Sequence, residues 1–255
     1  MKFKTTPYHF DLLKDSDRLA GFLQAIRDYG GKMDLAYDLG CGSGVLSYFL
    51  SDYFKEIVAV EIEKGTYDCA KENLADFDNI QVVHSDVLNY DFTKKADLIV
   101  CEMMDTALID EEEIPVLNHV RQFLKNDGKI IPQGVINSAE LVNMQREYIH
   151  WDENAKYEAM SRPVIYSEFN FLEDINPDFE AEIIFKAMHD GKVNGLKITT
   201  FTKLNDNLIC GPTPMLNPPL LIPLEEKFVK GNDLIKVKLK YIMGNGIESI
   251  KSEII

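Results

Sequence analysis

The sequence has few cysteines, a shortage of basic residues and no long apolar run, and each shortage excludes a class of protein. The four cysteines among its 255 residues are widely spaced. They form no C-x-x-C pair, which excludes a zinc ribbon and fits a reducing compartment. No apolar run approaches the roughly 20 residues of a membrane helix, and the stretch from Met1 to Pro7 is too polar for a signal peptide. We therefore expect a cytoplasmic protein with no metal site and no membrane association.

The shortage of basic residues constrains the partner. Lys and Arg number 27 against 42 Asp and Glu, a formal net charge of -15. A polyanion would be repelled by this charge unless a basic patch were focused locally. The charge favours a cationic substrate over nucleic acid, although acidity can also serve solubility alone.

Strand-like and helix-like segments alternate between Met33 and Gln133. Such alternation is typical of a parallel sheet with crossover helices. We expect strands at 35–38, 56–60, 80–83, 96–101 and 129–131, and helices at 45–54, 64–77 and 111–124. A turn at Asp127-Gly128 should precede the last strand.

After Pro132, strand-like runs dominate, at 182–185, 195–201 and 234–241. The last run alternates apolar residues with lysines, which predicts a half-exposed antiparallel strand. A less regular stretch lies between Tyr148 and Asp178. The predicted fold is α/β, with a Rossmann-like doubly wound domain over residues 1–133 and an antiparallel β domain over residues 134–255.

A glycine-rich loop, Asp38-Leu39-Gly40-Cys41-Gly42-Ser43-Gly44, follows the first predicted strand. Such a loop lets backbone N–H groups and a helix N-terminus approach a ligand closely. The dinucleotide fingerprint G-x-G-x-x-G fails, because Val45 stands at its third glycine. Glu61 ends the second strand, where an acid can accept hydrogen bonds from both ribose hydroxyls.

The pattern acidic-x-G-x-G-x-G resembles motif I of class I methyltransferases, which implies S-adenosyl-L-methionine as the cofactor. In that family the acid and the loop hold the methionine part. Asp86, just past the third strand, matches the family's acid near the adenine amino group, with Val87 beside it. Each acid alone could instead be a cap or turn residue.

Two glutamates, Glu102 and Glu111, follow the fourth strand. Their spacing resembles the "double-E" hairpin of protein arginine methyltransferases, which implies that they are the catalytic residues. Two carboxylates can hold a planar guanidinium by bidentate hydrogen bonds and localise its charge. Alternatively, Glu111 provides the first turn of a helix together with Glu112 and Glu113.

The resemblance extends to both sides of these motifs. The segment His9 to Arg18 resembles the N-terminal helix that folds over the cofactor in these enzymes, and Arg18 matches the arginine that pairs with its carboxylate. Gly128 to Pro132 resembles the passage from the catalytic domain into a barrel-like domain. The expected cofactor-binding residues are Arg18, Asp38, Gly40, Cys41, Gly42, Glu61, Ile62, Asp86 and Val87.

The chain also departs from this family. The paired aromatics before the N-terminal helix are missing, and the threonine-histidine-tryptophan loop has no counterpart near Met215 to Leu221. Asp105 stands where the family has Gly. The segment 147–170 is short for the dimerisation arm, which leaves the oligomeric state open.

These observations predict a methyltransferase that acts on a nitrogen acceptor, with a protein arginine guanidinium favoured. One alternative is an RNA methyltransferase on the same scaffold, for which Lys227 to Lys240 could contact phosphate. Another is a cofactor-binding scaffold without catalysis. Asn217-Pro218-Pro219-Leu220 resembles the N-P-P-aromatic motif of amino-directed nucleic-acid methylases. It lies far downstream of the fourth strand, and we expect a rigid turn there.

Overall fold

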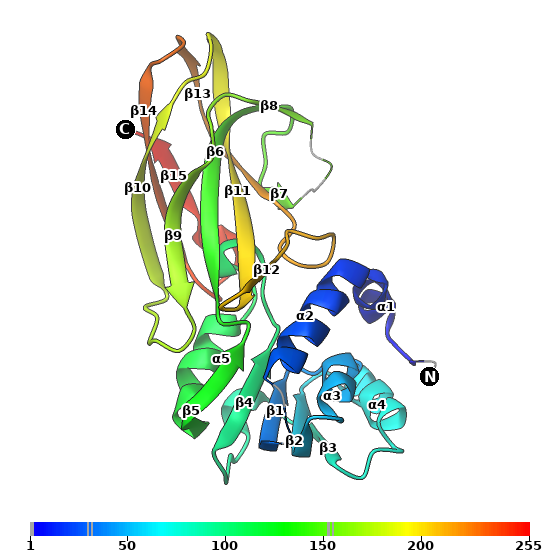
Figure 1. Cartoon of the computed structure of the whole chain (residues 1–255). Helices are drawn as coiled ribbons and strands as arrows, with labels where there is room; N and C mark the ends of the chain where they lie inside the picture. The colour runs from blue at the N-terminus through cyan, green and yellow to red at the C-terminus, as the bar shows by residue number, and fades with distance from the viewer. Residues whose placement is uncertain (1–2, 30, 32, 152–153, 155) are drawn as a thin grey trace.

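A computed structural model describes residues 3–29, 31, 33–151, 154 and 156–255. Met1 and Lys2 of the polar N-terminal stretch lie outside the described residues. The chain forms a helix-covered parallel sheet and, beyond it, a tall unit of antiparallel strands that contains the C-terminus (Figure 1).

The parallel sheet has the strand order β3-β2-β1-β4-β5. The chain steps outward from β1 to β3 and then returns to place β4 on the other side of β1. Leu39 of β1 pairs with Cys101 of β4, so the segments that follow these two strands start side by side. Ligands of such sheets bind at this switch point, outside the carboxyl ends of the strands. The five strands are β1 (Met33–Leu39), β2 (Phe54–Glu61), β3 (Ile80–His84), β4 (Ala96–Cys101) and β5 (Leu124–Ile131).

The crossover helices are shorter than predicted. The helices are α3 (Val45–Leu50), α4 (Lys64–Asn73) and α5 (Glu113–Val120), the last continued by the 3-10 turn η3 (Arg121–Phe123). Helix α3 ends early because Phe54 is buried in β2 and the carbonyl of Tyr53 accepts from Met33 N–H at 2.8 Å.

The predicted turn at Asp127-Gly128 is wrong, because these residues lie inside β5. The pairing of β5 with β4 shifts register between Ala96 and Leu98, and this irregularity absorbs the extra residues.

The predicted N-terminal helix is two helices, α1 (Pro7–Lys14) and α2 (Ser16–Asp28). Asp15 separates them and caps α2, because its Oδ1 accepts from Arg18 N–H at 3.0 Å. Its Oδ2 accepts from the Thr213 hydroxyl and from Met215 N–H. Helix α2 contacts α3 and β5 of one part, and β11 and β12 of the other. One buried aspartate therefore ties the N-terminal helices to a loop nearly 200 residues away.

All strands after Pro132 pair antiparallel, which confirms the predicted fold class. One sheet has the order β7-β13-β11-β6-β8, with β9 on β6 and β12 on β11, and the other has the order β10-β14-β15. Contacts between β9 and β10, and between β13 and β15, join the two sheets into a barrel-like unit. Its strands are β6 (Gly134–Met144), β7 (His150–Trp151), β8 (Tyr157–Ala159), β9 (Val164–Asn170), β10 (Asp178–Lys186), β11 (Gly191–Asn205), β12 (Leu208–Cys210), β13 (Leu220–Val229), β14 (Leu234–Ile242) and β15 (Lys251–Ile254).

Two expectations for this unit have different outcomes. The stretch from 148 to 178 is more regular than predicted, since it contains β7, β8 and β9. The half-exposed strand is confirmed, because buried residues alternate with partly exposed lysines along β14. Lys238 and Lys240 form ion pairs with Glu180 of β10 at 2.9 and 2.6 Å, and Lys236 pairs with Glu182.

Among the described residues, no helix is long and apolar enough to cross a membrane.

The barrel-like unit holds the segment that connects β4 to α5. Ala107 N–H donates to the Thr200 hydroxyl of β11 at 2.8 Å, and this hydroxyl donates to Asn137 Oδ1 at 2.6 Å. The Thr106 hydroxyl donates to the carbonyl of Pro218 at 2.6 Å. Gly244 N–H donates to the carbonyl of Leu108 at 3.1 Å.

We expect Thr200→Val to lower the free energy of unfolding by about 2 kcal/mol. Val would leave the buried Ala107 N–H and the side-chain Oδ1 of Asn137 without this hydrogen-bond partner. Denaturant unfolding monitored by circular dichroism measures this loss. Thr199→Val, at the partly exposed neighbour, is the control and should stay within about 0.5 kcal/mol of the wild type. Equal losses in the two variants would contradict the role of the Thr200 hydroxyl.

Candidate active site

A cavity of about 250 Å³ lies where the carboxyl ends of β1 and β4 meet. The glycine loop, the end of β2, the two N-terminal helices and the segment after β4 all contribute to its wall. The structure thus brings together most of the residues that the sequence singled out. Those that line the cavity are Arg18, Gly40, Cys41, Gly42, Glu61, Ile62, Glu102 and Glu111, with Tyr8, His9, Leu12, Leu13, Ser43, Val45, Leu46, Met103, Met104 and Met215 around them.

The glycine loop needs glycine for two reasons. Gly40 and Gly42 have φ of 67° and 57°, in the left-handed region that side chains disfavour. A Cβ at Gly40 would also lie 2.5 Å from the Met103 side chain, and one at Gly42 would lie 2.8 Å from the His9 ring. The loop therefore lets both the segment after β4 and helix α1 approach its backbone.

Glu61 is oriented by backbone groups. Its Oε2 accepts from Gly42 N–H at 3.0 Å and its Oε1 from Glu63 N–H at 2.8 Å. The carboxylate thus links the end of β2 to the glycine loop at the edge of the cavity. Each oxygen can accept a further hydrogen bond, as a ribose hydroxyl would require.

Asp38 lies beneath the loop. It is 1% exposed, and its Oδ2 accepts from the Ser47 hydroxyl of α3 at 2.5 Å. Burial raises the pKa of this carboxyl to about 7. Asp38 does not line the cavity in the described part of the chain, and a direct contact to the cofactor stays a prediction.

Arg18 and Glu102 form a buried ion pair at the cavity wall. Arg18 Nε donates to Glu102 Oε1 at 3.3 Å, and Nη2 donates to Oε2. Arg18 Nη1 is buried and has no hydrogen-bond partner among the described residues. A buried guanidinium N–H must find an acceptor, and a carboxylate suits it best. The glycine loop and Arg18 together fit a ligand with the amino-acid end of S-adenosylmethionine.

Asp86 and Val87 lie just after β3 and are not among the described residues that line the cavity. Asp86 Oδ1 accepts from Leu88 N–H at 2.9 Å and its Oδ2 from the Asn89 side chain at 2.6 Å, so Asp86 caps the 3-10 turn η1 (Val87–Asn89). Val87 is buried in the core. Their predicted roles near adenine stay predictions.

Glu111 lines the same cavity as the glycine loop. Helix α5 begins at Glu113, so Glu111 does not lie in its first turn. Partial burial, and then the charge of Glu102, raise the pKa of Glu111.

Two further carboxyls support this segment and were missed from the sequence. Burial raises the pKa of Asp105 to about 7 and that of Glu113 to about 8. A signal for Glu113 was available, because it shares the buried face of α5 with Val116 and Leu117 at helical spacing. No local signal distinguished Asp105 from a turn residue.

The loop that was expected to lack a family counterpart lies at the site. Met215 lines the cavity, and the carbonyl of Pro218 bonds to Thr106. Asn217 is buried and donates to the Thr202 hydroxyl at 2.8 Å. Asn217 is not among the described residues that line the cavity, and it serves as part of a fixed turn.

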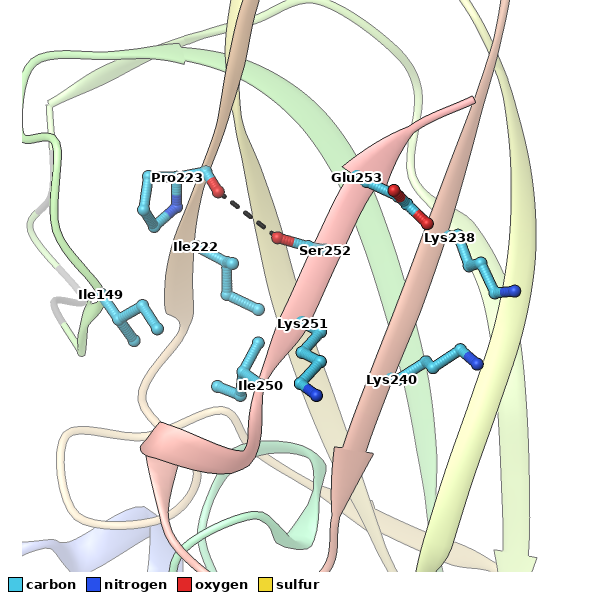
Figure 2. A pocket seen from close by; sticks show the side chains of 9 residues that line it. All are labelled: Ile149, Ile222, Pro223, Lys238, Lys240, Ile250, Lys251, Ser252 and Glu253. Carbon is cyan, nitrogen blue, oxygen red and sulfur yellow. Dashed lines mark hydrogen bonds between the residues drawn. The ribbon is translucent and has the colours of Figure 1, made fainter.

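A larger cavity, of about 620 Å³, lies beside β13, β14 and β15 (Figure 2). Ile149, Ile222 and Ile250 lie on one side of it and Lys238 and Lys240 on the other. It contains none of the predicted site residues within the described ranges, and these two lysines are already paired with Glu180. The smaller cavity is therefore the candidate active site, because the glycine loop, Arg18 and Glu102 line it.

Known proteins resemble this chain in domain, sequence and fold. Residues 36–128 match a family model described as a methyltransferase domain. An uncharacterised protein of Methanothermobacter thermautotrophicus is 44% identical over 255 residues, which is all of both chains. An uncharacterised protein of Methanocaldococcus jannaschii is 39% identical and covers 98% of each chain.

A solved structure, the Trypanosoma brucei PRMT1 enzyme–prozyme heterotetrameric complex with AdoHcy, matches 98% of both chains. The TM-score is 0.82 at 15% sequence identity, a likeness of fold.

We expect the protein to lose stability as the pH rises from about 5 to about 8. The folded-state pKa values of Asp38, Asp105 and Glu113 lie at about 7, 7 and 8. Unfolded carboxyls titrate near 4, so the folded state binds more protons across this window. The melting temperature, followed by circular dichroism, should fall by about 5 °C or more.

Glu113→Gln removes one of these titrating groups, so its melting temperature should fall less between about pH 5 and about pH 8 than that of the wild type. The lowered pKa of His9 makes the stability rise with pH near about pH 6 and so opposes this fall. The lowered pKa values of Asp34 and Asp97 affect the stability only below about pH 5. A melting temperature that rises from pH 5 to pH 8 would contradict the buried protonated carboxyls.

Proposed function

We propose that this chain, which belongs to the same family as the Methanothermobacter and Methanocaldococcus proteins, methylates a protein arginine guanidinium. The chain is a class I S-adenosylmethionine-dependent methyltransferase, and the proposal starts from that premise. The observation that carries the proposal is that Glu102 and Glu111 line one cavity together with the glycine loop. The fold shared with the PRMT1 complex supports it.

The two glutamates suit a planar cation. A guanidinium presents N–H groups in a fixed fork that matches carboxylate oxygens. Glu102 pairs with Arg18 on one side. The remaining lone pairs of its two carboxylate oxygens can accept hydrogen bonds from the guanidinium of the substrate. Together the carboxylates draw the positive charge toward two of the acceptor nitrogens, which leaves the third with more lone-pair character.

S-adenosylmethionine, when bound, supplies a sulfonium methyl group that the acceptor nitrogen takes with its lone pair, while the carbon–sulfur electron pair stays on sulfur. The glycine loop, Glu61 and Arg18 would hold the cofactor, and Glu102 and Glu111 would orient the acceptor. Glu111 would accept the proton that the methylated nitrogen releases, because burial and the charge of Glu102 raise its pKa. Positioning and electrostatics would provide most of the acceleration.

Charge favours protein over RNA as the acceptor. The net charge of -15 attracts basic segments and repels a polyanion. Lys236, Lys238 and Lys240 are engaged with Glu180 and Glu182, which leaves them poorly placed to contact phosphate. The four free cysteines suit a reaction in the reducing cytoplasm.

Transfer of radiolabelled methyl groups from S-adenosylmethionine to a host lysate tests this function. We expect label in protein that survives ribonuclease, is lost on protease treatment, and appears as methylarginine after hydrolysis. Glu102→Gln should lower transfer by about 100-fold or more, because the amide cannot localise the guanidinium charge. Its cofactor affinity, measured by calorimetry, should stay within about threefold of the wild type, a change well under 1 kcal/mol.

Glu112→Gln is the matched control, because Glu112 is exposed beside Glu111 and does not line the cavity. It should transfer label like the wild type. Label that ribonuclease removes would instead identify RNA as the acceptor, and methyllysine would exclude arginine. Cofactor binding without transfer to any fraction would support a scaffold.

A further inference from the structure

Two carboxyls that do not line the cavity, Glu113 and Asp105, hold the two ends of the segment from Glu102 to Glu111 by hydrogen bonds. Glu113 lies at the start of α5, and Asp105 lies within the segment. Neither is among the described residues that line the cavity, yet both accept hydrogen bonds from backbone beside Glu102 and Glu111.

Glu113 holds the first end. Its side chain is 0% exposed, and its Oε2 accepts from Met103 N–H at 3.0 Å. Met103 directly follows Glu102, and its side chain packs over Gly40 so closely that a Cβ there would lie 2.5 Å away. One hydrogen bond therefore fixes the Met103 backbone, which directly follows Glu102 and carries the side chain that lies over Gly40.

Asp105 holds the second end. Its Oδ1 accepts from Asp110 N–H at 3.0 Å and from Glu111 N–H at 3.3 Å. These bonds close the segment on itself and direct Glu111 back toward the cavity. Backbone at Ala107 and Leu108 is left-handed, with φ of 61° and 63°, so the segment needs such partners to keep its shape.

We propose that Glu113 and Asp105 are positioning residues that fix the backbone on which Glu102 and Glu111 stand. This inference rests on the proposed function, because it assigns these carboxyls to the geometry of that acceptor site. A displacement of about 1 Å in a catalytic group can cost about 100-fold in rate.

The chemistry of the two carboxyls suits this role. One oxygen of each, Glu113 Oε1 and Asp105 Oδ2, is buried without a hydrogen-bond partner in the described chain. Burial favours a proton on such a group. A neutral carboxyl still accepts from a backbone N–H through its carbonyl oxygen.

Glu113→Met and Glu113→Gln separate positioning from bulk. Met fills the space but cannot accept from Met103 N–H, whereas Gln keeps a carbonyl oxygen there. We expect Glu113→Met to lower kcat by about tenfold or more, with the KM for S-adenosylmethionine within about twofold, since each twofold change is only about 0.4 kcal/mol. Glu113→Gln should restore kcat to within about threefold of the wild type, since the hydrogen bond is kept. Glu112→Met, at the exposed neighbour, should transfer label like the wild type.

Asp105→Ala and Asp105→Asn form the second pair. Ala removes the acceptor for the Asp110 and Glu111 N–H groups, and Asn keeps it. Asp105→Ala should lower kcat by about tenfold or more, and Asp105→Asn should recover most of the loss.

Amide hydrogen exchange, followed by NMR, tests the same contacts without any acceptor. In Glu113→Met the Met103 amide should exchange about tenfold faster than in the wild type, as expected for the loss of about one hydrogen bond. Glu113→Gln and Glu112→Met should keep its protection. In Asp105→Ala the Asp110 and Glu111 amides should lose protection in the same way.

These readouts separate two failures. If the wild type transfers no label, the proposed function fails, and the amide exchange alone decides whether the two carboxyls fix the segment. Unchanged exchange or unchanged kcat in Glu113→Met and Asp105→Ala would overturn the inference. Failure of Glu113→Met or Asp105→Ala to fold, with a working Gln or Asn variant, would indicate a purely structural role and also overturn it.

Discussion

The site depends on how the backbone between β4 and α5 finds its hydrogen-bond partners. This segment leaves a buried sheet and turns through left-handed residues, so its polar groups cannot satisfy one another fully. Partners come from the barrel-like unit, where Thr200, Pro218 and Gly244 bond to it, and from Glu113 at the start of α5. Glu102 and Glu111 therefore stand where both parts of the chain hold them, and neither part alone would define their geometry.

The second constraint is the concentration of acid around one cavity. The carboxyls differ in their partners and in their burial. Glu102 pairs with Arg18, Glu61 is held by two backbone N–H groups, and burial raises the pKa of Asp38 to about 7. Partial burial and the charge of Glu102 raise the pKa of Glu111. The cationic acceptor proposed above would relieve the repulsion that remains between the carboxylates.

The fold class and much of the site could be predicted from sequence because their signals are local. The glycine loop needs glycine at Gly40 and Gly42, and an acid at the end of a parallel strand, such as Glu61, lies at the ligand-binding edge wherever the strand sits in the sheet. Asp86 had the same local signal, and the structure places it as the cap of η1, outside the cavity-lining residues. Asp15 and Met215 could not be predicted, because the bond between them joins residues that are far apart in sequence.

The sequence by itself determined the alternation of strands and helices between Met33 and Gln133, the glycine loop and the pair of glutamates, because each is a short pattern of residue types. Only the tertiary structure decided that Arg18 lies against Glu102, that Asp105 and Glu113 bond to the segment from Glu102 to Glu111, and that the barrel-like unit holds this segment. The physical reason is that a buried polar group must be paired. Which group pairs with it is set by the packing of distant elements, and no short pattern contains that information.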